Sequence, residues 1–217
     1  MLDEKTNALA DLAQNGRMEN IFATPIFSHV FKGMEALNRE LREVILEKER
    51  TAPSVSKSNL GGWQSPPDFF GWGGGTVAAL ERHVRFALNV ATVRATAPQC
   101  LKASFDLFGW AAVNRNGHCN APHLHPGATW SGVYYVDPGD EEAGGQLEFA
   151  HPVAAAAMTF FPGALPSARL IKPEPGLIVL FPSYLIHSVR MYRGERPRVC
   201  VPFNAHMTSA VARNQVA

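Results

Sequence analysis

The fold of this chain is indicated most clearly by the stretch Gly176-Leu-Ile-Val-Leu-Phe-Pro-Ser-Tyr-Leu-Ile-His187, in which an apolar strand and a tight turn lead into another strand. Outward from it, the chain beyond residue 103 consists of short segments rich in aromatic and β-branched residues, separated by turns such as Pro138-Gly139-Asp140. A series of short strands of this kind predicts a jelly roll. We expect the strands near residues 103–114, 120–125, 130–137, 146–150, 158–161, 167–171, 177–181, 185–191 and 197–204.

Two amphipathic helices are expected before these strands. Apolar residues recur at helical spacing between residues 37 and 50, and again between about Thr76 and Ala95. Residues 52–75, between the two helices, are dense in serine, proline and glycine, which excludes regular structure for most of that length. We predict an α+β chain with the helices packed on the outside of the jelly roll. The predicted buried faces consist of Leu37, Leu41, Val44 and Ile45 in the first helix, and of Val77, Leu80, Val84 and Leu88 in the second.

Length and composition limit the number of domains, the kinds of partner and the cellular location that we expect. The 217 residues suffice for one domain with a sizeable core, which we divide into a helical part, about residues 1–100, and a β core, about residues 101–207. Lys and Arg number 20 and Asp and Glu 19, a formal net charge of +1, so nucleic acid is not an expected partner. The three cysteines include no CxxC pair, and no apolar run fits a signal peptide or a membrane span. We expect a cytoplasmic protein that does not bind membranes.

The triplet His123-Leu124-His125 is the strongest indication of a metal site. In a strand, residues i and i+2 point to the same face, so both imidazoles could reach one ion. Alone, two histidines beside prolines could equally be polar groups of a surface loop. His187, at the end of the stretch quoted first, favours the metal site over the surface loop, because a jelly roll brings a late strand back beside an early one. Three facial ligands would leave open positions on an octahedral metal.

Arg198 is the next candidate. It begins a segment in which strand alternation separates Arg198, Cys200 and Pro202 on one face from Val199, Val201 and Phe203 on the other. A guanidinium that faces the interior of a small barrel needs an anionic partner. A dicarboxylate held by the metal at one end and by the guanidinium at the other would supply it. The alternative is a surface arginine in a basic run, because Arg190, Arg193 and Arg196 are close in sequence.

These residues resemble a known family, an uncharacterised bacterial group of 2-oxoglutarate-Fe(II) oxygenases related to the prolyl-hydroxylase-like enzymes. The resemblance extends over most of the chain, from Phe22-Ala-Thr-Pro25 to Asn204. It is carried by the motifs Ser58-Asn-Leu-Gly-Gly-Trp-Gln-Ser65, His123-Leu-His-Pro-Gly-Ala-Thr-Trp-Ser-Gly-Val-Tyr-Tyr135, Phe181-Pro-Ser-Tyr-Leu-Ile-His187 and Arg198-Val-Cys-Val-Pro-Phe-Asn204.

The resemblance implies a double-stranded β-helix, with Fe(II) bound by His123, His125 and His187 and with 2-oxoglutarate as co-substrate. By similarity to the wider superfamily, Arg198 would bind the distal carboxylate of 2-oxoglutarate. Tyr135 resembles the second member of a tyrosine pair that helps to hold this carboxylate in prolyl hydroxylases. The implied reaction is hydroxylation of a small-molecule or peptide substrate with release of succinate and CO2.

One departure leaves alternatives open. The superfamily usually reads His-x-Asp where this chain has His123-Leu124-His125, so a neutral imidazole replaces a carboxylate and the metal could be zinc, copper or nickel rather than iron. A cupin-like metalloenzyme that does not use 2-oxoglutarate is a second interpretation, although residues 126–130 lack the glutamate that cupins place there. A non-catalytic jelly-roll module with a structural metal is a third, although such sites usually have a fourth protein ligand.

Several residues have two open interpretations. Asn114 and Ser131, on strands expected to adjoin the site, could support it or serve in packing and turn capping. Trp63 and the glycine-rich residues 71–75 could cover the opening, or Trp63 could belong to the core. The aromatic residues Trp63, Phe69, Phe70 and Trp72 could serve a homodimer contact or a lid. His118 is not expected to bind the metal.

Overall fold

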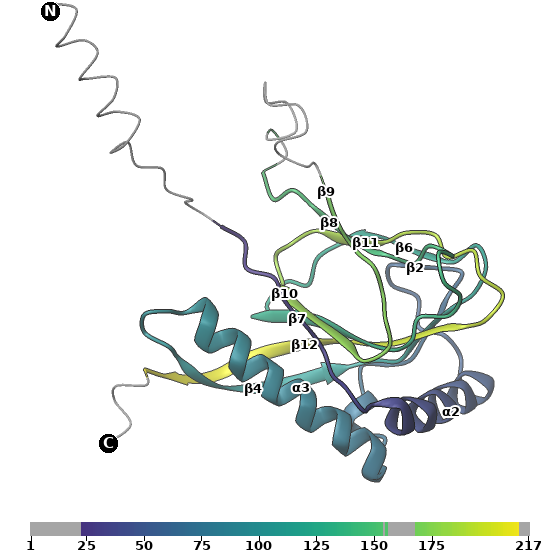
Figure 1. Ribbon diagram of the computed structural model, residues 1–217, viewed down its shortest axis with the longest axis horizontal. Helices are drawn as coiled ribbons and strands as arrows, with labels where there is room; N and C mark the ends of the chain where they lie inside the picture. The colour runs from purple at the N-terminus through teal and green to yellow at the C-terminus, as the bar shows by residue number, and fades with distance from the viewer. Residues whose placement is uncertain (1–22, 154, 156–167, 213–217) are drawn as a thin grey trace, which may run out of the picture.

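The strands form two antiparallel sheets in the computed structural model, which describes residues 23–153, 155 and 168–212 (Figure 1). The major sheet has seven strands in the order β1-β10-β7-β12-β5-β3, with β4 paired to β12, and the minor sheet has five in the order β2-β6-β11-β8-β9. This arrangement confirms the predicted jelly roll. The major sheet contains β1 (Phe27–Val30), β3 (Trp63–Gln64), β4 (Lys102–Gly109), β5 (Ala112–Asn114), β7 (Trp130–Asp137), β10 (Leu177–Pro182) and β12 (Arg198–Val211); the minor sheet contains β2 (Asn59–Leu60), β6 (Cys119–His123), β8 (Leu147–Ala150), β9 (Ala168–Ile171) and β11 (His187–Val189).

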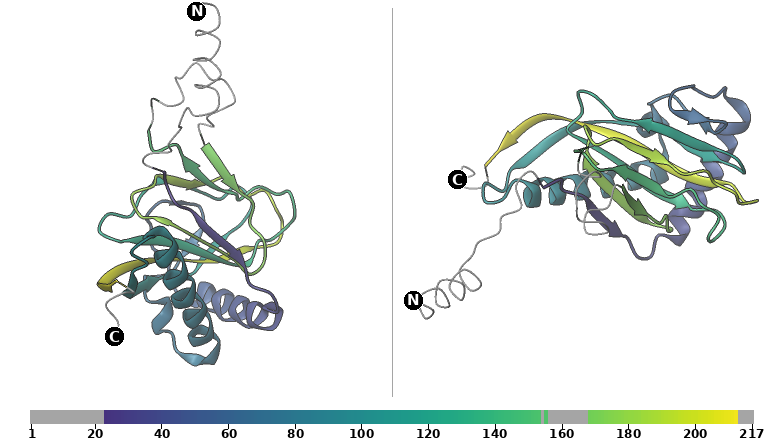
Figure 2. Two further views of the ribbon diagram at one scale, coloured as in Figure 1. Left: turned by 60° about the vertical axis from the view of Figure 1, so that its left-hand side comes forward. Right: turned by 90° about the horizontal axis from the view of Figure 1, so that it is seen from above.

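Both predicted helices are present, and Figures 1 and 2 show them on the face of the major sheet that is turned away from the minor sheet. Helix α2 (Glu35–Thr51) contacts β7, and helix α3 (Gly74–Ala95) contacts β4 and β10. In α2, Leu41 and Ile45 are fully buried as predicted, but Val44 is 42% exposed because it lies beside the buried face rather than on it. The predicted face of α3 is buried throughout.

Strand alternation divides the buried side chains into two cores. On β7, Tyr134 and Val136 point toward the helices, whereas Val133 and Tyr135 point into the space between the two sheets. On β12, the predicted alternation is also found: Val199, Val201 and Phe203 pack in the helix-side core, while Cys200 belongs to the core between the sheets. The interior between the sheets is therefore reached only by alternate residues of each strand.

The strand from residue 103 to 114 was expected to be continuous, but it is divided into β4 and β5. The division lies opposite Pro202 of β12, which has no N–H to donate to a neighbouring strand. Trp110, between the two strands, still donates its N–H to the Pro202 carbonyl at 3.0 Å. Beyond this point β12 continues to Val211, farther than the predicted end at residue 204. The strand expected at 158–161 lies outside the described residues.

The segment 52–75 contains the short strands β2 and β3 and one turn of 3-10 helix, η1 (Phe69–Gly71). Its aromatic residues turn inward: Trp63 and Phe69 are buried in the helix-side core, and Phe70 and Trp72 pack against it. Trp63 also donates its indole N–H to the Ala52 carbonyl at 2.9 Å. These side chains are therefore part of the core and form no lid, which removes the observation on which the homodimer prediction rested. Within the described residues, no helix is long and apolar enough to cross a membrane.

Candidate metal centre

A cavity of about 650 Å³ lies between the two sheets. Its walls come from β5, β7 and β12 of the major sheet, from β6 and β11 of the minor sheet, and from residues 55–67. The three predicted histidines line one part of this cavity, which we call the metal end. Arg198, Tyr135 and Asn114 line another part, which we call the anion end.

The backbone of the minor sheet brings the histidines together. His123 ends β6 and His187 begins β11, and the two residues are paired directly across the antiparallel ladder. His125 follows two residues later, where its N–H donates to the Ser183 carbonyl at 3.0 Å. One ring nitrogen from each histidine lies within 4.8 Å of the others, close enough to share one metal ion. The jelly roll thus joins residues that are distant in the chain, as the sequence predicted.

Hydrogen bonds orient two of the imidazoles. Nδ1 of His123 lies 2.7 Å from the Ala121 carbonyl, and Nδ1 of His187 lies 2.9 Å from the Leu185 carbonyl. A carbonyl oxygen only accepts, so each Nδ1 carries the hydrogen and each Nε2 keeps a free lone pair. These two hydrogen bonds to backbone carbonyls fix the tautomer that a metal requires.

Burial keeps the three histidines neutral. It lowers the pKa of His123, lowers that of His125 to about 4 and lowers that of His187 to about 3, because a buried imidazolium loses its hydration. For the last two, the positive charge of a neighbouring protonated imidazole acts in the same direction. Near pH 7 all three lone pairs are therefore available. Nitrogen donors of this kind suit Fe(II), and they also suit zinc, copper and nickel.

The anion end contains a buried charge without a counter-ion. Arg198 is 2% exposed, and no acidic side chain among the described residues lies within salt-bridge distance of it. Its Nη1 donates to Cys200 Sγ at 3.3 Å and its Cζ lies 5.2 Å from the centre of the Tyr135 ring. Its Nε has no hydrogen-bond partner in the described part of the chain. A buried guanidinium in this state is strongly unfavourable unless an anion binds. The geometry therefore fits a carboxylate.

Tyr135 adds a second unpaired group. Its side chain is fully buried, and its hydroxyl has no hydrogen-bond partner within the described part of the chain. Burial raises the pKa of this phenol to about 12, and the nearby Arg198 charge partly opposes that shift. The hydroxyl therefore keeps its proton at neutral pH and can donate it to an anion beside Arg198.

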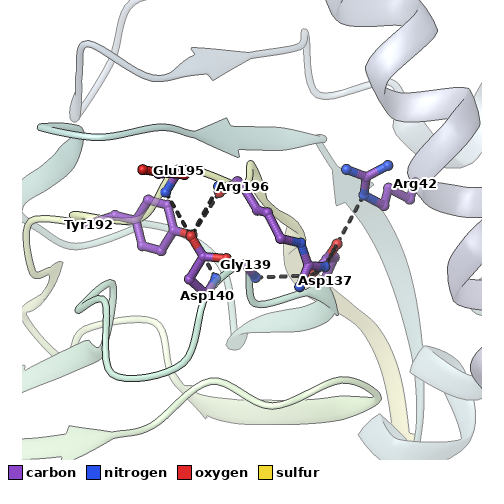
Figure 3. Close-up of polar contacts among 7 residues, drawn as sticks. All are labelled: Arg42, Asp137, Gly139, Asp140, Tyr192, Glu195 and Arg196. Carbon is purple, nitrogen blue, oxygen red and sulfur yellow. Dashed lines mark hydrogen bonds and ion pairs between the residues drawn. The ribbon is translucent and has the colours of Figure 1, made fainter.

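Figure 3 shows a polar cluster that fixes the chain just before Arg198. Asp137, at the end of β7, accepts hydrogen bonds from Arg42 Nε at 2.9 Å and from Arg196 Nη2 at 3.0 Å. Asp140 accepts the backbone N–H of Arg196 at 3.1 Å, and the Tyr192 hydroxyl donates to the Arg196 carbonyl at 2.7 Å. Since β12 begins two residues later, this cluster sets where the guanidinium enters the cavity.

Gly145 allows the Arg198 side chain to pack against the backbone. A Cβ atom at position 145 would lie 2.8 Å from Arg198 Cδ and 3.0 Å from Arg198 Nε. Gly145 also has a φ of +71°, in the left-handed region that favours glycine. Gly145 was not among the residues predicted to form the site, although Gly144-Gly145 before a predicted strand marks a place where backbone and side chain approach closely.

Several of residues 55–67 line the cavity, and one of them, Ser58, lies beside the metal end; no sequence pattern indicated this contact. The Ser58 carbonyl accepts the Ala121 N–H at 2.9 Å, which anchors the segment to β6. The Ser58 hydroxyl donates to His123 Nε2 at 3.4 Å, so a metal bound at this nitrogen would displace that hydrogen bond, and the hydroxyl accepts from Asn120 Nδ2 at 3.2 Å. Residues 71–75, which were expected to cover the opening, instead lead into α3. The wall beside the metal position is therefore the earlier segment.

The remaining polar candidates have separate roles. Ser131 donates its hydroxyl to Asn204 Oδ1 at 2.8 Å, and both residues line the cavity. His118 accepts the Arg115 N–H at 3.0 Å and is not part of the histidine cluster, as expected.

Comparisons with known proteins agree with this geometry. Residues 109–204, which carry all five predicted site residues, match the family model described as "Putative 2OG-Fe(II) oxygenase". No curated protein sequence is significantly similar to the chain. The family match, together with the fold, points to a 2-oxoglutarate-dependent Fe(II) oxygenase with Fe(II) and 2-oxoglutarate as cofactors, and it confirms the recognition made from the sequence.

Solved structures share the fold at low sequence identity. A prolyl-4-hydroxylase from Pseudomonas putida is 16% identical, with a TM-score of 0.61 over 94% of this chain and 99% of that one. A prolyl hydroxylase from Trichoplax adhaerens, in complex with a hypoxia inducible factor peptide fragment, is 16% identical, with a TM-score of 0.62 over 94% and 91%. HygX from Streptomyces hygroscopicus, with nickel, 2-oxoglutarate and hygromycin B bound, is 16% identical, with a TM-score of 0.55 over 85% and 84%. These likenesses confirm the double-stranded β-helix.

Proposed function

We propose that this chain, whose residues 109–204 match the 2OG-Fe(II) oxygenase family, is a dioxygenase that hydroxylates a small-molecule or peptide substrate with release of succinate and CO2. In this proposal, His123, His125 and His187 bind Fe(II), and Arg198 and Tyr135 bind the distal carboxylate of 2-oxoglutarate. The whole chain would act as a single oxygenase domain.

The observation that carries the proposal is the presence of two complementary sites in one cavity. The metal end offers three neutral nitrogen donors, and the anion end offers a buried guanidinium and an unpaired phenol. A 2-oxo dicarboxylate has one end that chelates a metal and one end that pairs with an arginine, so one molecule would satisfy both. The histidine cluster includes no fourth ligand from the described residues, which fits an open catalytic site better than a closed structural one.

The residues of the chain position the reactants and exclude water. When bound, Fe(II) and 2-oxoglutarate supply an oxidation in which O2 is consumed, 2-oxoglutarate is decarboxylated to succinate, and one oxygen atom enters a C–H bond of the substrate. The three imidazoles would hold the metal and, as three ligands, would leave room for the co-substrate on it. Arg198 and Tyr135 hold the far carboxylate in a dry recess, where charge-assisted hydrogen bonds are strong. The chain thus contributes orientation, and the cofactors contribute the chemistry.

The substrate would occupy the part of the cavity beside Ser58, whose hydroxyl lies 3.4 Å from His123 Nε2. The cavity lining also includes Lys57, Gln64, Trp110 and Asn204. Two proteins of the same fold are known with a peptide fragment or with hygromycin B bound, which supports either class of substrate here. A cytoplasmic location remains part of the proposal and is supported by three cysteines that form no disulfide.

The test is 2-oxoglutarate turnover without a prime substrate. The purified chain is loaded with Fe(II) under anaerobic conditions, mixed with 2-oxoglutarate and exposed to oxygen, and succinate is quantified. We expect slow succinate formation that needs both metal and oxygen and that is absent in the His187→Ala variant. If the wild-type chain binds Fe(II) but neither binds nor converts 2-oxoglutarate, the proposal is wrong and the cupin-like interpretation is favoured.

A further inference from the structure

Asn114 is a buried polar residue of the anion end whose amide group is not satisfied. It is the last residue of β5, it is 2% exposed, and its Nδ2 has no hydrogen-bond partner among the described residues. It also lines the cavity. An unpaired buried amide is unfavourable, and such groups in folded proteins need an explanation. Because the amide lies at a cavity, a bound ligand would provide one.

Asn114, Arg198 and Tyr135 form a row across three neighbouring strands. Asn114 of β5 is directly opposite Arg198 of β12, and Tyr135 of β7 is opposite Cys200, two residues along β12. Residues that face each other across an antiparallel pair point to the same side of the sheet. The three side chains therefore reach the same end of the cavity, and each has a buried polar atom without a partner: Nδ2, Nε and the phenol oxygen.

We propose that Asn114 is a third ligand of the distal carboxylate of 2-oxoglutarate, beside Arg198 and Tyr135; this inference rests on the proposed function. A carboxylate offers about four acceptor positions on two oxygens, enough for donors from three strands. The amide adds a donor without adding charge. The anion end thus keeps the single positive charge of Arg198, which one carboxylate neutralises.

Gly62 leaves the room that the Asn114 side chain occupies. A Cβ atom at position 62 would lie 2.9 Å from Asn114 Oδ1 and 3.1 Å from the Val113 carbonyl oxygen. The turn between β2 and β3 therefore covers the Asn114 amide closely on one side. A side chain at position 62 would crowd the Asn114 amide, so glycine at this position lets the amide keep its place in the cavity wall.

The first experiment measures co-substrate affinity in the Asn114→Ala variant. The chain is loaded with Fe(II) without oxygen, and 2-oxoglutarate binding is followed by calorimetry. Loss of one hydrogen bond to a charged group is expected to raise the dissociation constant roughly tenfold. The affinity for 2-oxopentanoate, which keeps the metal-binding keto acid and lacks the distal carboxylate, should not change. An unchanged 2-oxoglutarate affinity, or an equal loss for both acids, overturns the role of Asn114.

The second experiment uses Asn114→Asp, which places a carboxylate opposite Arg198. We expect the metal-free variant to melt at a higher temperature than the wild-type chain, because the guanidinium gains a partner, and to bind 2-oxoglutarate at least tenfold more weakly. Because a carboxylate beside Arg198 would weaken anion binding whether or not the wild-type amide contacts the co-substrate, this variant tests whether position 114 faces the guanidinium. An unchanged melting temperature together with an unchanged co-substrate affinity would show that it does not, and that result contradicts the proposal. Failure of the wild-type chain to bind 2-oxoglutarate would instead refute the proposed function, so the two failures are distinguishable.

Discussion

The metal end and the anion end of the cavity differ in how their buried polar groups are satisfied. At the metal end, His123 and His187 each direct Nδ1 to a backbone carbonyl two residues earlier, and His123 Nε2 also accepts the Ser58 hydroxyl. At the anion end, Arg198 and Tyr135 are more deeply buried, yet each retains an atom without a partner. The ring N–H groups of His123 and His187 thus have hydrogen-bond partners without any ligand, whereas the buried polar atoms of the anion end need a ligand to gain theirs.

This difference has a physical consequence for binding. Neutral imidazoles can remain buried at modest cost, so the metal end can be preformed in the metal-free chain. A buried guanidinium without a counter-ion is unfavourable, and an anion that pairs with it relieves this cost. We therefore expect metal binding to depend on geometry that already exists and co-substrate binding to depend mainly on charge. Four predictions test this distinction, beginning with the largest expected effect.

Removal of a proposed metal ligand should affect both ends. His187→Ala removes one of the three nitrogen donors, and we expect bound iron to fall from one equivalent to near zero, with a loss of succinate formation. Metal analysis of the anaerobically loaded protein measures this directly. His118→Ala is the matched control, because His118 lies close in sequence to the site but outside the histidine cluster. Full iron occupancy in His187→Ala would exclude this residue as a ligand.

Removal of the guanidinium should affect the anion end alone. Arg198→Ala is expected to weaken 2-oxoglutarate binding at least about 30-fold, since loss of one partner from a buried charge pair costs about 2–5 kcal/mol. Iron stoichiometry should stay at the wild-type value. Calorimetry and metal analysis of the same preparation separate the two effects. Arg193→Ala, which removes an exposed arginine of the same connection, should change neither quantity. Equal co-substrate affinity in wild type and Arg198→Ala would show that Arg198 does not bind 2-oxoglutarate.

The sequence predicted the main positions at both ends, because each depends on a regular pattern. His123 and His187 followed from the way a jelly roll pairs distant strands, and they are indeed paired in register. Arg198 followed from the alternation of β12, which separates it from Val199 and its apolar neighbours. Residues set by strand period and strand pairing are predictable in this way.

Residues set by contacts between irregular segments could not be predicted. Phe69 stands in a glycine-rich stretch that suggested exposure, yet it is fully buried because η1 turns it against α3. Ser58 lies beside His123 only because its segment pairs with β6. Gly145 matters because the Arg198 side chain, which belongs to β12, packs against the backbone of the loop between β7 and β8. In each case the decisive partner is distant in sequence and no periodic pattern marks it.

The position of Arg198 can be disturbed without altering Arg198 itself. Gly145→Ala places a methyl group against Arg198 Cδ and Nε, and it is expected to weaken 2-oxoglutarate binding by about tenfold, because a displaced guanidinium loses hydrogen bonds of about 1.5–3 kcal/mol. Gly33→Ala is the control, since Gly33 has the same φ of +71° with nothing within 4 Å of the added atom. Both variants should lose about 1–2 kcal/mol of stability from backbone strain. Only Gly145→Ala should lose affinity, as measured by calorimetry beside thermal melts.

The smallest expected effect concerns pH at the metal end. Protons compete with the metal for the imidazole lone pairs, so a lowered pKa moves this competition to lower pH. Three imidazoles with an ordinary pKa near 6.5 would lose roughly fourfold in affinity each, or roughly 50-fold together, between pH 7.5 and 6.0. With the pKa of His125 at about 4 and that of His187 at about 3, neither is protonated in this range, and the burial of His123 lowers its pKa in the same direction. Metal titrations at the two pH values should therefore differ only a few-fold, whereas a 50-fold decrease would show that the metal-free histidines are open to water and that the metal end is not preformed.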